Sequence, residues 1–314
     1  HIRTPLTMAR DLLQVTDLSR TQLLALLRQA VLCKRNRRLG RRALAGKTVA
    51  LVFQKPSMRT RVAFEVAVLQ LGGTVVYLGQ DDIQLGRREP VKDVARVLSR
   101  YVDAIVVRTF AHQDATDFAR YAGVPVINGL SDLMHPCQAL ADLLTMQEQF
   151  GRLRGVTMAY IGDGNNVLHS LVEACALTGV HLTAATPAAY RPDAGVWRNA
   201  QRLARASGSC IRWTADPREA ARGADVLYAD VWVSMGQETR RRRKRQAFRR
   251  YQLNDALLKL AAPRARVMHC LPAHRGEEIT DRVMEHRRSV IFDQAENRLH
   301  VQKALLLFLM GGKA

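Results

Sequence analysis

Long apolar runs are missing from this sequence. The best of them, ALLLFLM at 304–310, is far shorter than the roughly 20 residues that a helix needs to cross a bilayer. The first residues, HIRTPLTMARDLL, also lack the apolar segment of a secretory signal peptide. We therefore expect a protein without a membrane partner, located in the cytoplasm.

Cysteine is scarce as well: there are five, an odd number, and they have no paired spacing. This pattern predicts reduced thiols in a cytosol-like compartment and argues against a disulfide framework. The segment RVMHCLPAHRG contains His269, Cys270 and His274, but the paired ligand spacings of structural zinc are missing. The sequence therefore predicts no metal site.

Acidic residues are few, with 28 Asp and Glu against 48 Lys and Arg, which gives a net charge of +20. Such an excess suggests nucleic-acid binding, because a basic surface attracts phosphate backbones. Aromatic residues make up only 6%, however, no nucleic-acid motif is present, and the basic residues are spread along the chain. We expect no specific nucleic-acid partner. We expect the densest block, RRRRKRQAFRR at 240–250, to be a partly helical segment that faces solvent.

What the sequence does contain is a regular alternation of short apolar runs with helical patterns. After an amphipathic helix at about 8–33, strands are expected at 48–53, 74–78, 103–107 and 124–128. A long helix is expected at 136–150, followed by strands at 156–161, 180–185, 210–213, 225–230, 265–270 and 289–292. The closing NRLHVQKALLLFLM predicts a last helix. This alternation predicts an α/β protein with two doubly wound parallel-sheet domains, which suits a chain of 314 residues.

A cluster of polar residues follows the first expected strand, in FQKPSMRTRVAFEVAVLQLGG at 53–73. Ser57, Arg59, Thr60 and Arg61 stand at a strand-to-helix turn, where free backbone N–H groups and the helix dipole favour an anion. Guanidinium groups add bidentate contacts to phosphate or carboxylate oxygens. The alternative is a serine N-cap followed by solvated arginines.

Further polar residues follow other expected strands, where ligands gather in open α/β sheets. They are Arg108, His135, Gln138, Asn165, Asn166, Asp230, Ser234, Met235, Cys270, Leu271 and Arg298. Several have an ordinary structural explanation: His135 as a helix cap, Cys270 as a small buried side chain, Asp230 as a turn cap. The motif GDGNN suggests a dinucleotide fingerprint, but Val167 replaces its third glycine and the next strand, HLTAATP, ends without an acidic residue. These two departures argue against a nicotinamide-dependent dehydrogenase.

Taken together, the clusters divide into two chemical sets. The first half of the chain offers a set that suits a phosphate beside a polarised carbonyl: Ser57, Arg59, Thr60, Arg108, His135 and Gln138. The second half offers Asn166, Asp230 and Ser234, which suit the ammonium and carboxylate of an amino acid. The sequence therefore predicts a transferase with two substrates.

The same motifs carry a resemblance to a known family. SMRTR resembles the phosphate loop Ser-Thr-Arg-Thr-Arg of the ornithine carbamoyltransferases, and INGLSDL, HPCQ, GDGNN, HCLP and AENR follow in order along nearly the whole chain. DVWVSMGQE carries the Ser-Met-Gly loop, which the sister aspartate carbamoyltransferases lack. The chain therefore resembles the ornithine branch of the aspartate/ornithine carbamoyltransferase superfamily. Met58 stands where the family usually has threonine, so one side-chain hydroxyl is missing there.

The resemblance implies a carbamoyl-phosphate-binding domain at 1–147, on which a C-terminal helix at 293–314 packs, and an ornithine-binding domain at 148–292. It also implies an active-site cleft between the domains and a homotrimer. The residues implied for carbamoyl phosphate are Ser57, Met58, Arg59, Thr60, Arg108, His135, Gln138, Cys270, Leu271 and Arg298, with Gln84 supplied by an adjacent chain. Those implied for ornithine are Asn166, Asp230, Ser234 and Met235, and those implied in catalysis are Arg108, His135, Asp230, Cys270 and Arg298.

The activity that the resemblance implies is attack by the side-chain amine of L-ornithine on the carbonyl carbon of carbamoyl phosphate, giving L-citrulline and phosphate. Chemistry of this kind needs no cofactor. Transfer to another amine, such as putrescine or acetylornithine, is the alternative that the residues leave open.

Overall fold

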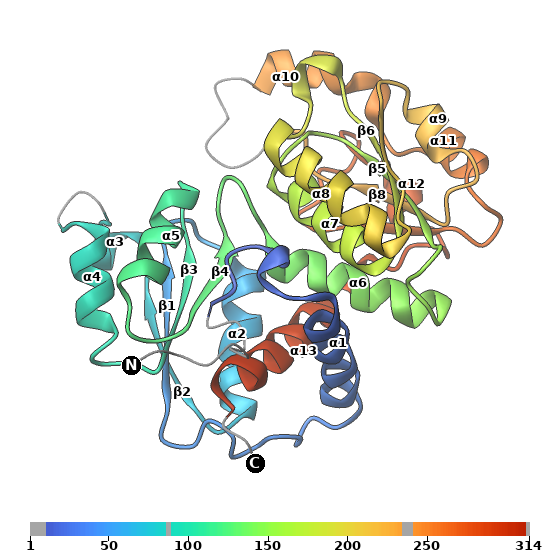
Figure 1. Cartoon of the computed structure of the whole chain (residues 1–314). Coiled ribbons are helices and arrows are strands. Elements are labelled where there is room, and N and C mark those ends of the chain that lie inside the picture. Colours follow the sequence, from blue (N-terminus) through green and yellow to red (C-terminus); the bar gives the residue numbers. More distant parts are fainter. Residues whose placement is uncertain (1–10, 86–88, 234–240, 312–314) are drawn as a thin grey trace. The chain divides into compact units, whose positions relative to one another are not determined.

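The computed structural model describes residues 11–85, 89–233 and 241–311 (Figure 1). The chain divides into two compact units, His1–Leu144 with Asn297–Ala314, and Thr145–Glu296. The two divisions fall inside the helices α6 Pro136–Phe150 and α13 Ile291–Met310. The boundaries expected from the sequence, 147/148 and 292/293, lie in the same two helices. None of the helices within the described residues is long and apolar enough to span a membrane.

The first unit contains a four-stranded parallel sheet in the order β2-β1-β3-β4. Its strands are β1 Thr48–Phe53, β2 Thr74–Leu78, β3 Ala104–Arg108 and β4 Val126–Leu130. The central strands β1 and β3 are buried almost throughout, as expected of parallel strands that are covered on both faces. The edge strand β2 keeps two exposed side chains, those of Thr74 and Val76, and its other three are half-buried.

Helices cover both faces of this sheet (Figure 1). On one face, α4 Val91–Leu98 and α5 His112–Tyr121 pack against alternate residues of β1 and β3, with Phe118 and Val107 among the buried contacts. On the other face lie α1 Arg20–Arg35, α2 Met58–Gln70 and the C-terminal part of α13. Lys303 of α13 donates to Gln70 Oε1 at 3.2 Å, which ties the last helix to α2. The short α3 Gln80–Ile83 follows β2.

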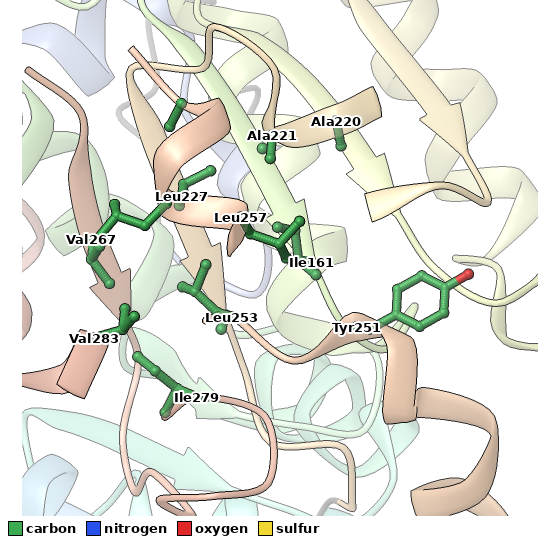
Figure 2. Packing of buried hydrophobic residues seen from close by; sticks show 14 of the residues in the cluster. Ile161, Ala220, Ala221, Leu227, Tyr251, Leu253, Leu257, Val267, Ile279 and Val283 are labelled. Carbon is green, nitrogen blue, oxygen red and sulfur yellow. The ribbon is translucent and has the colours of Figure 1, made fainter. Parts of the chain in front are cut away.

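The second unit contains a five-stranded parallel sheet in the order β7-β6-β5-β8-β9. Its strands are β5 Thr157–Ile161, β6 His181–Ala185, β7 Ile211–Thr214, β8 Val226–Ala229 and β9 Arg266–His269. Its helices are α7 Asn166–Thr178, α8 Ala194–Ser207, α9 Pro217–Ala221, α10 Arg241–Phe248, α11 Asp255–Leu260 and α12 Asp281–Met284. Figure 2 shows apolar side chains of the strands, such as Leu227 and Val267, packed with those of α11 and α12, such as Leu257 and Val283. The predicted fold class, two parallel-sheet α/β domains, is confirmed.

The helix expected at about 8–33 begins only at Arg20, so that its predicted start was wrong. Ser19 and Gln22 form a capping box: Ser19 Oγ accepts from Gln22 N at 3.2 Å, and Gln22 Oε1 accepts from Ser19 N at 2.8 Å. Before this cap, Leu12 forms an isolated parallel bridge with Ile127. The capping signal therefore outweighs the apolar pattern that precedes it.

The strand expected at 289–292 was also wrong. Ser289 makes an isolated bridge with Val267, and the chain enters α13 at Ile291. Gln294 N donates to Val290 O at 2.9 Å, which is the bond of a first helical turn. A run as short as SVIF fits the start of a buried helix as well as it fits a strand.

Candidate active site

The first sheet has its topological switch point between β1 and β3, which are neighbours in the sheet although β2 separates them in the chain. Ligands of open α/β sheets bind outside the carboxyl ends of the strands at such a point. Phe53 at the end of β1 is paired with Arg108 at the end of β3, and Gln54 N donates to Arg108 O at 2.8 Å. The turn into α2 therefore begins beside Arg108.

The N-terminus of α2 is both capped and bonded to a guanidinium group. Ser57 Oγ accepts from Thr60 N at 3.3 Å and donates to Thr60 Oγ1 at 3.1 Å. Arg298 Nη2 donates to the same Thr60 oxygen at 2.6 Å. Arg61 lies outside this group, since it bonds Glu65 and its guanidinium carbon lies 3.7 Å from the centre of the Tyr77 ring. The serine cap and a cationic cluster thus exist together, and Arg61 is a surface residue.

Three guanidinium groups act on the buried imidazole of His135: those of Arg298, Arg108 and Arg59. Burial first, and then these charges in that order, hold the pKa of His135 well below its usual 6.5. Burial, followed by the charges of Arg298 and Arg59, also lowers the pKa of Arg108 to about 9, so that it remains charged at pH 7. The result is a neutral imidazole in positive surroundings, which favour an anion.

His135 is presented by a loop that buried polar side chains brace. Ser131 Oγ accepts from Met134 N at 3.1 Å, and Asn128 Nδ2 donates to Leu13 O at 2.9 Å. Both Ser131 and Asn128 are fully buried. Their bonds fix the chain between β4 and α6, and with it the position from which His135 extends.

The first turn of α6 adds a buried amide. Gln138 Nε2 donates to Asp142 Oδ1, one turn later, at 2.9 Å, and both side chains are buried. Because a carboxylate accepts hydrogen bonds, this bond fixes which end of the amide faces Asp142. Within the described residues, the buried Gln138 Oε1 accepts no hydrogen bond. An unpaired buried acceptor costs about 1–3 kcal/mol, so this position favours a ligand that can donate.

The second sheet has its switch point between β5 and β8. Asn165, which follows β5, caps α7: its Oδ1 accepts from Val167 N and Leu168 N at 3.0 and 3.3 Å. Its Nδ2 donates to Oδ2 of Asp230, which follows β8, at 2.6 Å. Cys270, which follows β9, donates its thiol to the other oxygen of Asp230 at 2.8 Å. The buried carboxylate is thereby held from both sides.

The surroundings of Asp230 are negative. Tyr160 OH, on β5, donates to Asp163 O at 2.9 Å and lies 3.3 Å from Asn165 Oδ1. Burial, followed by the charges of Asp230, Asp163 and Cys270, raises the pKa of Tyr160 well above 10. A site of this sign favours a cationic or hydrogen-bond-donating group such as an amine.

In the second unit, the structure adds Asn165 to the residues expected to bind a ligand, while Asn166 stays a prediction. Asn166 is the first residue of α7 and half-buried, whereas its neighbour Asn165 makes the contact with Asp230. An asparagine directly before an apolar helix is an N-cap signal, and that signal distinguishes the two. Leu271 has a φ of 58°, and its N–H donates to His269 Nδ1 at 2.9 Å. Ser234 and Met235 lie outside the described residues.

Two residues of the expected carbamoyl-phosphate set lie at the surface of the first unit. Met58, in the first turn of α2, is exposed, and Gln84, which ends α3 with a φ of 43°, is exposed as well.

Of the histidines considered for zinc, His269 Nε2 lies 3.1 Å from Glu278 Oε1 and His274 Nδ1 lies 3.7 Å from Glu278 Oε2. Nowhere in the described residues do three His, Cys, Asp or Glu side chains gather in a way that could hold a metal ion.

The expectation that the whole block at 240–250 faces solvent was wrong. Arg242, Arg243 and Arg245 of α10 are exposed, but Lys244 is buried and its Nζ lies 2.5 Å from Asp163 Oδ2. Phe248, one turn later, is fully buried. Residues at i and i+4 share one face of a helix, and this face of α10 packs against the unit.

Comparison with known proteins decides the family. A model described as the aspartate/ornithine carbamoyltransferase carbamoyl-P binding domain matches residues 10–148, and the corresponding Asp/Orn binding domain matches residues 154–309. The chain belongs to the aspartate/ornithine carbamoyltransferase family.

Individual relatives agree with this assignment. An ornithine carbamoyltransferase of Gloeobacter violaceus is 55% identical over 303 residues, which cover 96% of each chain. The anabolic ornithine carbamoyltransferase of Pyrococcus furiosus is 52% identical over 305 residues, or 96% of this chain and 97% of that protein. A solved structure of ornithine carbamoyltransferase from Pyrococcus furiosus matches with a TM-score of 0.94 and 51% identity, covering 98% of both chains. The resemblance drawn from the sequence is confirmed.

The two groups of polar residues divide between the family's two domains. Arg59, Arg108 and His135 lie within residues 10–148, which match the carbamoyl-P binding domain. Asp230 and Cys270 lie within the range that matches the Asp/Orn binding domain. Arg298 also falls in the second range, but it belongs to the first compact unit, where it bonds Thr60.

The lowered pKa of His135 predicts a pH dependence of stability. In the unfolded chain a histidine has a pKa near 6.5, so below that pH the unfolded chain binds a proton that the folded protein does not. The unfolding free energy should therefore fall by about 1.4 kcal/mol per pH unit below 6.5, until the folded pKa is reached. Denaturant unfolding of the protein and of His135→Gln between pH 5 and 8 checks this. Parallel curves for the two proteins would contradict a neutral, buried His135.

Proposed function

We propose that this chain transfers the carbamoyl group of carbamoyl phosphate to the side-chain amine of L-ornithine, giving L-citrulline and phosphate. Relatives that carry the name ornithine carbamoyltransferase share about half of its residues over nearly its whole length. The observation that carries the proposal is the opposite sign of the two switch points, one surrounded by arginines and the other centred on a carboxylate.

Carbamoyl phosphate binds at the first switch point. Arg59, Arg108 and Arg298 contact its phosphate, together with Ser57 and the N–H groups at the start of α2. Negative charge on the phosphate grows as its bond to the carbonyl carbon breaks, so donors that are already in place stabilise the departing dianion. Met58 contributes its backbone N–H group here, because its side chain is apolar and exposed.

The carbonyl group is activated in the same site. When the amine attacks, the carbonyl oxygen gains negative charge and needs donors, and Thr60, Arg108 and His135 supply them. A neutral imidazole suits this role because it can donate an N–H without adding another charge beside the arginines. Gln138 Oε1 accepts from the amino group of the carbamoyl moiety, while its Nε2 is held by Asp142.

Ornithine binds at the second switch point, and Asn166, Ser234 and Met235 complete the set of ornithine contacts that the family resemblance implies. Its reacting amine must be neutral, although a free alkyl amine has a pKa near 10.4. Asp230, fixed by Asn165 and Cys270, orients the amine and relays its proton as the new C–N bond forms. The reaction needs no cofactor, because phosphate is already a good leaving group. The cytoplasmic location expected from the sequence stays a prediction.

A single assay tests this function. The protein is incubated with carbamoyl phosphate and, in parallel, with L-ornithine, putrescine, acetylornithine or aspartate, and the carbamoylated product is measured. Citrulline formation that far exceeds every other product supports the proposal. Preferred use of putrescine or acetylornithine would mean that this amine, and not ornithine, is the acceptor. Absence of product with every amine would overturn the function.

Substitutions at the two switch points should have separable effects. Arg59→Ala removes a charge that stabilises the leaving phosphate, so turnover should fall about a hundredfold or more. Asp230→Asn keeps the size of the side chain and removes its charge, so use of ornithine should fall severely while carbamoyl-phosphate binding stays within about twofold. Steady-state kinetics and calorimetry with a stable phosphonate analogue measure the two effects. Loss of analogue binding in Asp230→Asn, with normal ornithine kinetics, would mean that carbamoyl phosphate and ornithine are assigned to the wrong switch points.

The Gln138–Asp142 bond predicts how the site tells a carbamoyl group from an acetyl group. In Asp142→Asn the new amide can donate or accept, so Gln138 is free to turn its oxygen away from the substrate. The preference for carbamoyl phosphate over acetyl phosphate, which has a methyl group in place of the amino group, should then fall about tenfold. Competition binding of the two phosphates checks this. Equal weakening of both would mean that Asp142 serves only to hold the fold.

We also propose a homotrimer, as the resemblance implies. An apolar stripe on the surface of α2, formed by Met58, Val62 and Leu69, supports association, as does exposed Val76 on the edge strand β2. An edge strand offers unpaired backbone groups to another chain, and exposed apolar patches mark sites of association. Gln84 extends from the surface a few residues after β2, which suits a contact with the site of a neighbouring chain.

A charge on that stripe should therefore dissociate the protein. Sedimentation is expected to give three times the chain mass of 35.2 kDa for the wild type and a lower mass for Leu69→Asp, with loss of activity. Phe292→Asp, at an equally exposed apolar residue of α13, is the control and should keep the mass of the wild type. A wild type that sediments as a monomer at assay concentrations would contradict the trimer.

A further inference from the structure

Lys244 is a buried cation of the basic block, and the proposed reaction leaves its burial unexplained. Its side chain is 6% exposed, that of its partner Asp163 is 9% exposed, and the two charged atoms lie 2.5 Å apart. Its ammonium group also lies 5.4 Å from the centre of the Tyr190 ring. Arg245, the next residue, forms its ion pair with Glu277 at the surface. Helix α10 therefore carries one ion pair inside the unit and one outside, at adjacent positions.

Asp163 belongs to the short loop 162–165, which connects β5 to α7. The loop is tightly packed, because a Cβ on Gly164 would lie 2.4 Å from the backbone of Arg191 and Pro192. Gly164 N donates to Tyr190 O at 3.0 Å. The loop can therefore move little without breaking these backbone contacts. The side chains of Asp163 and Asn165 hold it further, through Lys244 and Asp230.

The same loop holds Asp230. Asn165, two residues after Asp163, donates to Asp230 Oδ2 at 2.6 Å, and Tyr160 OH joins the loop at Asp163 O and Asn165 Oδ1. A displacement of Asp163 would thus be passed along a chain of short bonds to the carboxylate that is proposed to receive ornithine. Residues that do not touch a substrate often act by keeping the residues that do in their productive geometry.

The charge of Lys244 also bears on this loop. Burial raises the pKa of Asp163 and the charge of Asp230 raises it further, while the charge and hydrogen bond of Lys244 lower it. Without an ammonium group at this position, a second carboxylate would stand buried and unpaired near Asp230. A buried charge that loses its partner is strongly unfavourable, so the loop would protonate or rearrange.

On the basis of the proposed function, we infer that Lys244 is a positioning residue for the ornithine site. Through its ion pair with Asp163 it fixes the loop 162–165, and through Asn165 it fixes the orientation of Asp230. Arg243 and Arg245, its two neighbours in the chain, are exposed and take no part in this. A single lysine within a run of arginines is thereby assigned a role in substrate binding rather than in solubility.

The test compares Lys244→Met with Lys244→Arg and with the matched control Arg245→Met, which breaks the exposed ion pair of the next residue. Lys244→Met should raise the KM for ornithine about tenfold or more, and leave the KM for carbamoyl phosphate within about twofold. Lys244→Arg, which keeps the charge, should restore most of the ornithine affinity. Arg245→Met should leave both constants within about twofold, because exposed ion pairs contribute little.

Two results would overturn the inference. One is a folded Lys244→Met protein with an unchanged KM for ornithine, and the other is an equal rise in both Michaelis constants. If Lys244→Met does not fold, the double variant Asp163→Asn with Lys244→Met leaves no buried charge unpaired, and it should fold with a raised KM for ornithine. A normal KM in the double variant would also overturn the inference. Absence of citrulline in the wild-type assay would instead refute the proposed function, so the two failures are distinguishable.

Discussion

Repulsion among cations in a buried site is the constraint on which the first unit depends. Arg59, Arg108 and Arg298 come from three separate parts of the chain, and their charges, after burial, keep His135 neutral. Bringing such groups together is unfavourable unless an anion joins them. The switch point between β1 and β3 and the N-terminus of α2 add further attraction for negative charge. Such a site favours negative charge, and negative charge grows on the phosphate as it leaves carbamoyl phosphate. An enzyme that releases phosphate can therefore use the site to stabilise its transition state.

The second unit has a switch point of the same kind, but the charge at that point is negative. Again two central parallel strands end side by side, but the side chain held there is the carboxylate of Asp230, fixed by an amide and a thiol. Lys244 fits into this arrangement as the neutralising partner of the neighbouring Asp163, rather than as a ligand of the substrate. The switch points of the two parallel sheets thus carry opposite charge, which suits the two substrates of the proposed reaction.

The sequence predicted much of this, because buried parallel strands appear as short apolar runs and because site residues follow the ends of those runs. Its failures have local causes. The contact of Asn165 with Asp230 was missed, because Asn165 and Asn166 are identical neighbours and only the geometry of the α7 cap distinguishes them. Lys244 is hidden among arginines, since the inward face of α10 is set by how the helix packs and composition does not reveal it. The run SVIF is too short to distinguish a strand from the start of α13.

Thermal unfolding in inorganic phosphate tests the central claim, that the first unit is a cationic site completed by an anion, most directly. A few millimolar phosphate should raise the melting temperature of the protein above that in sodium chloride of equal ionic strength, because a ligand of the folded state stabilises it. Arg108→Gln should lose that rise, which separates binding at the site from a general salt effect. Equal melting temperatures in the two salts, or an equal rise in Arg108→Gln, would contradict the claim.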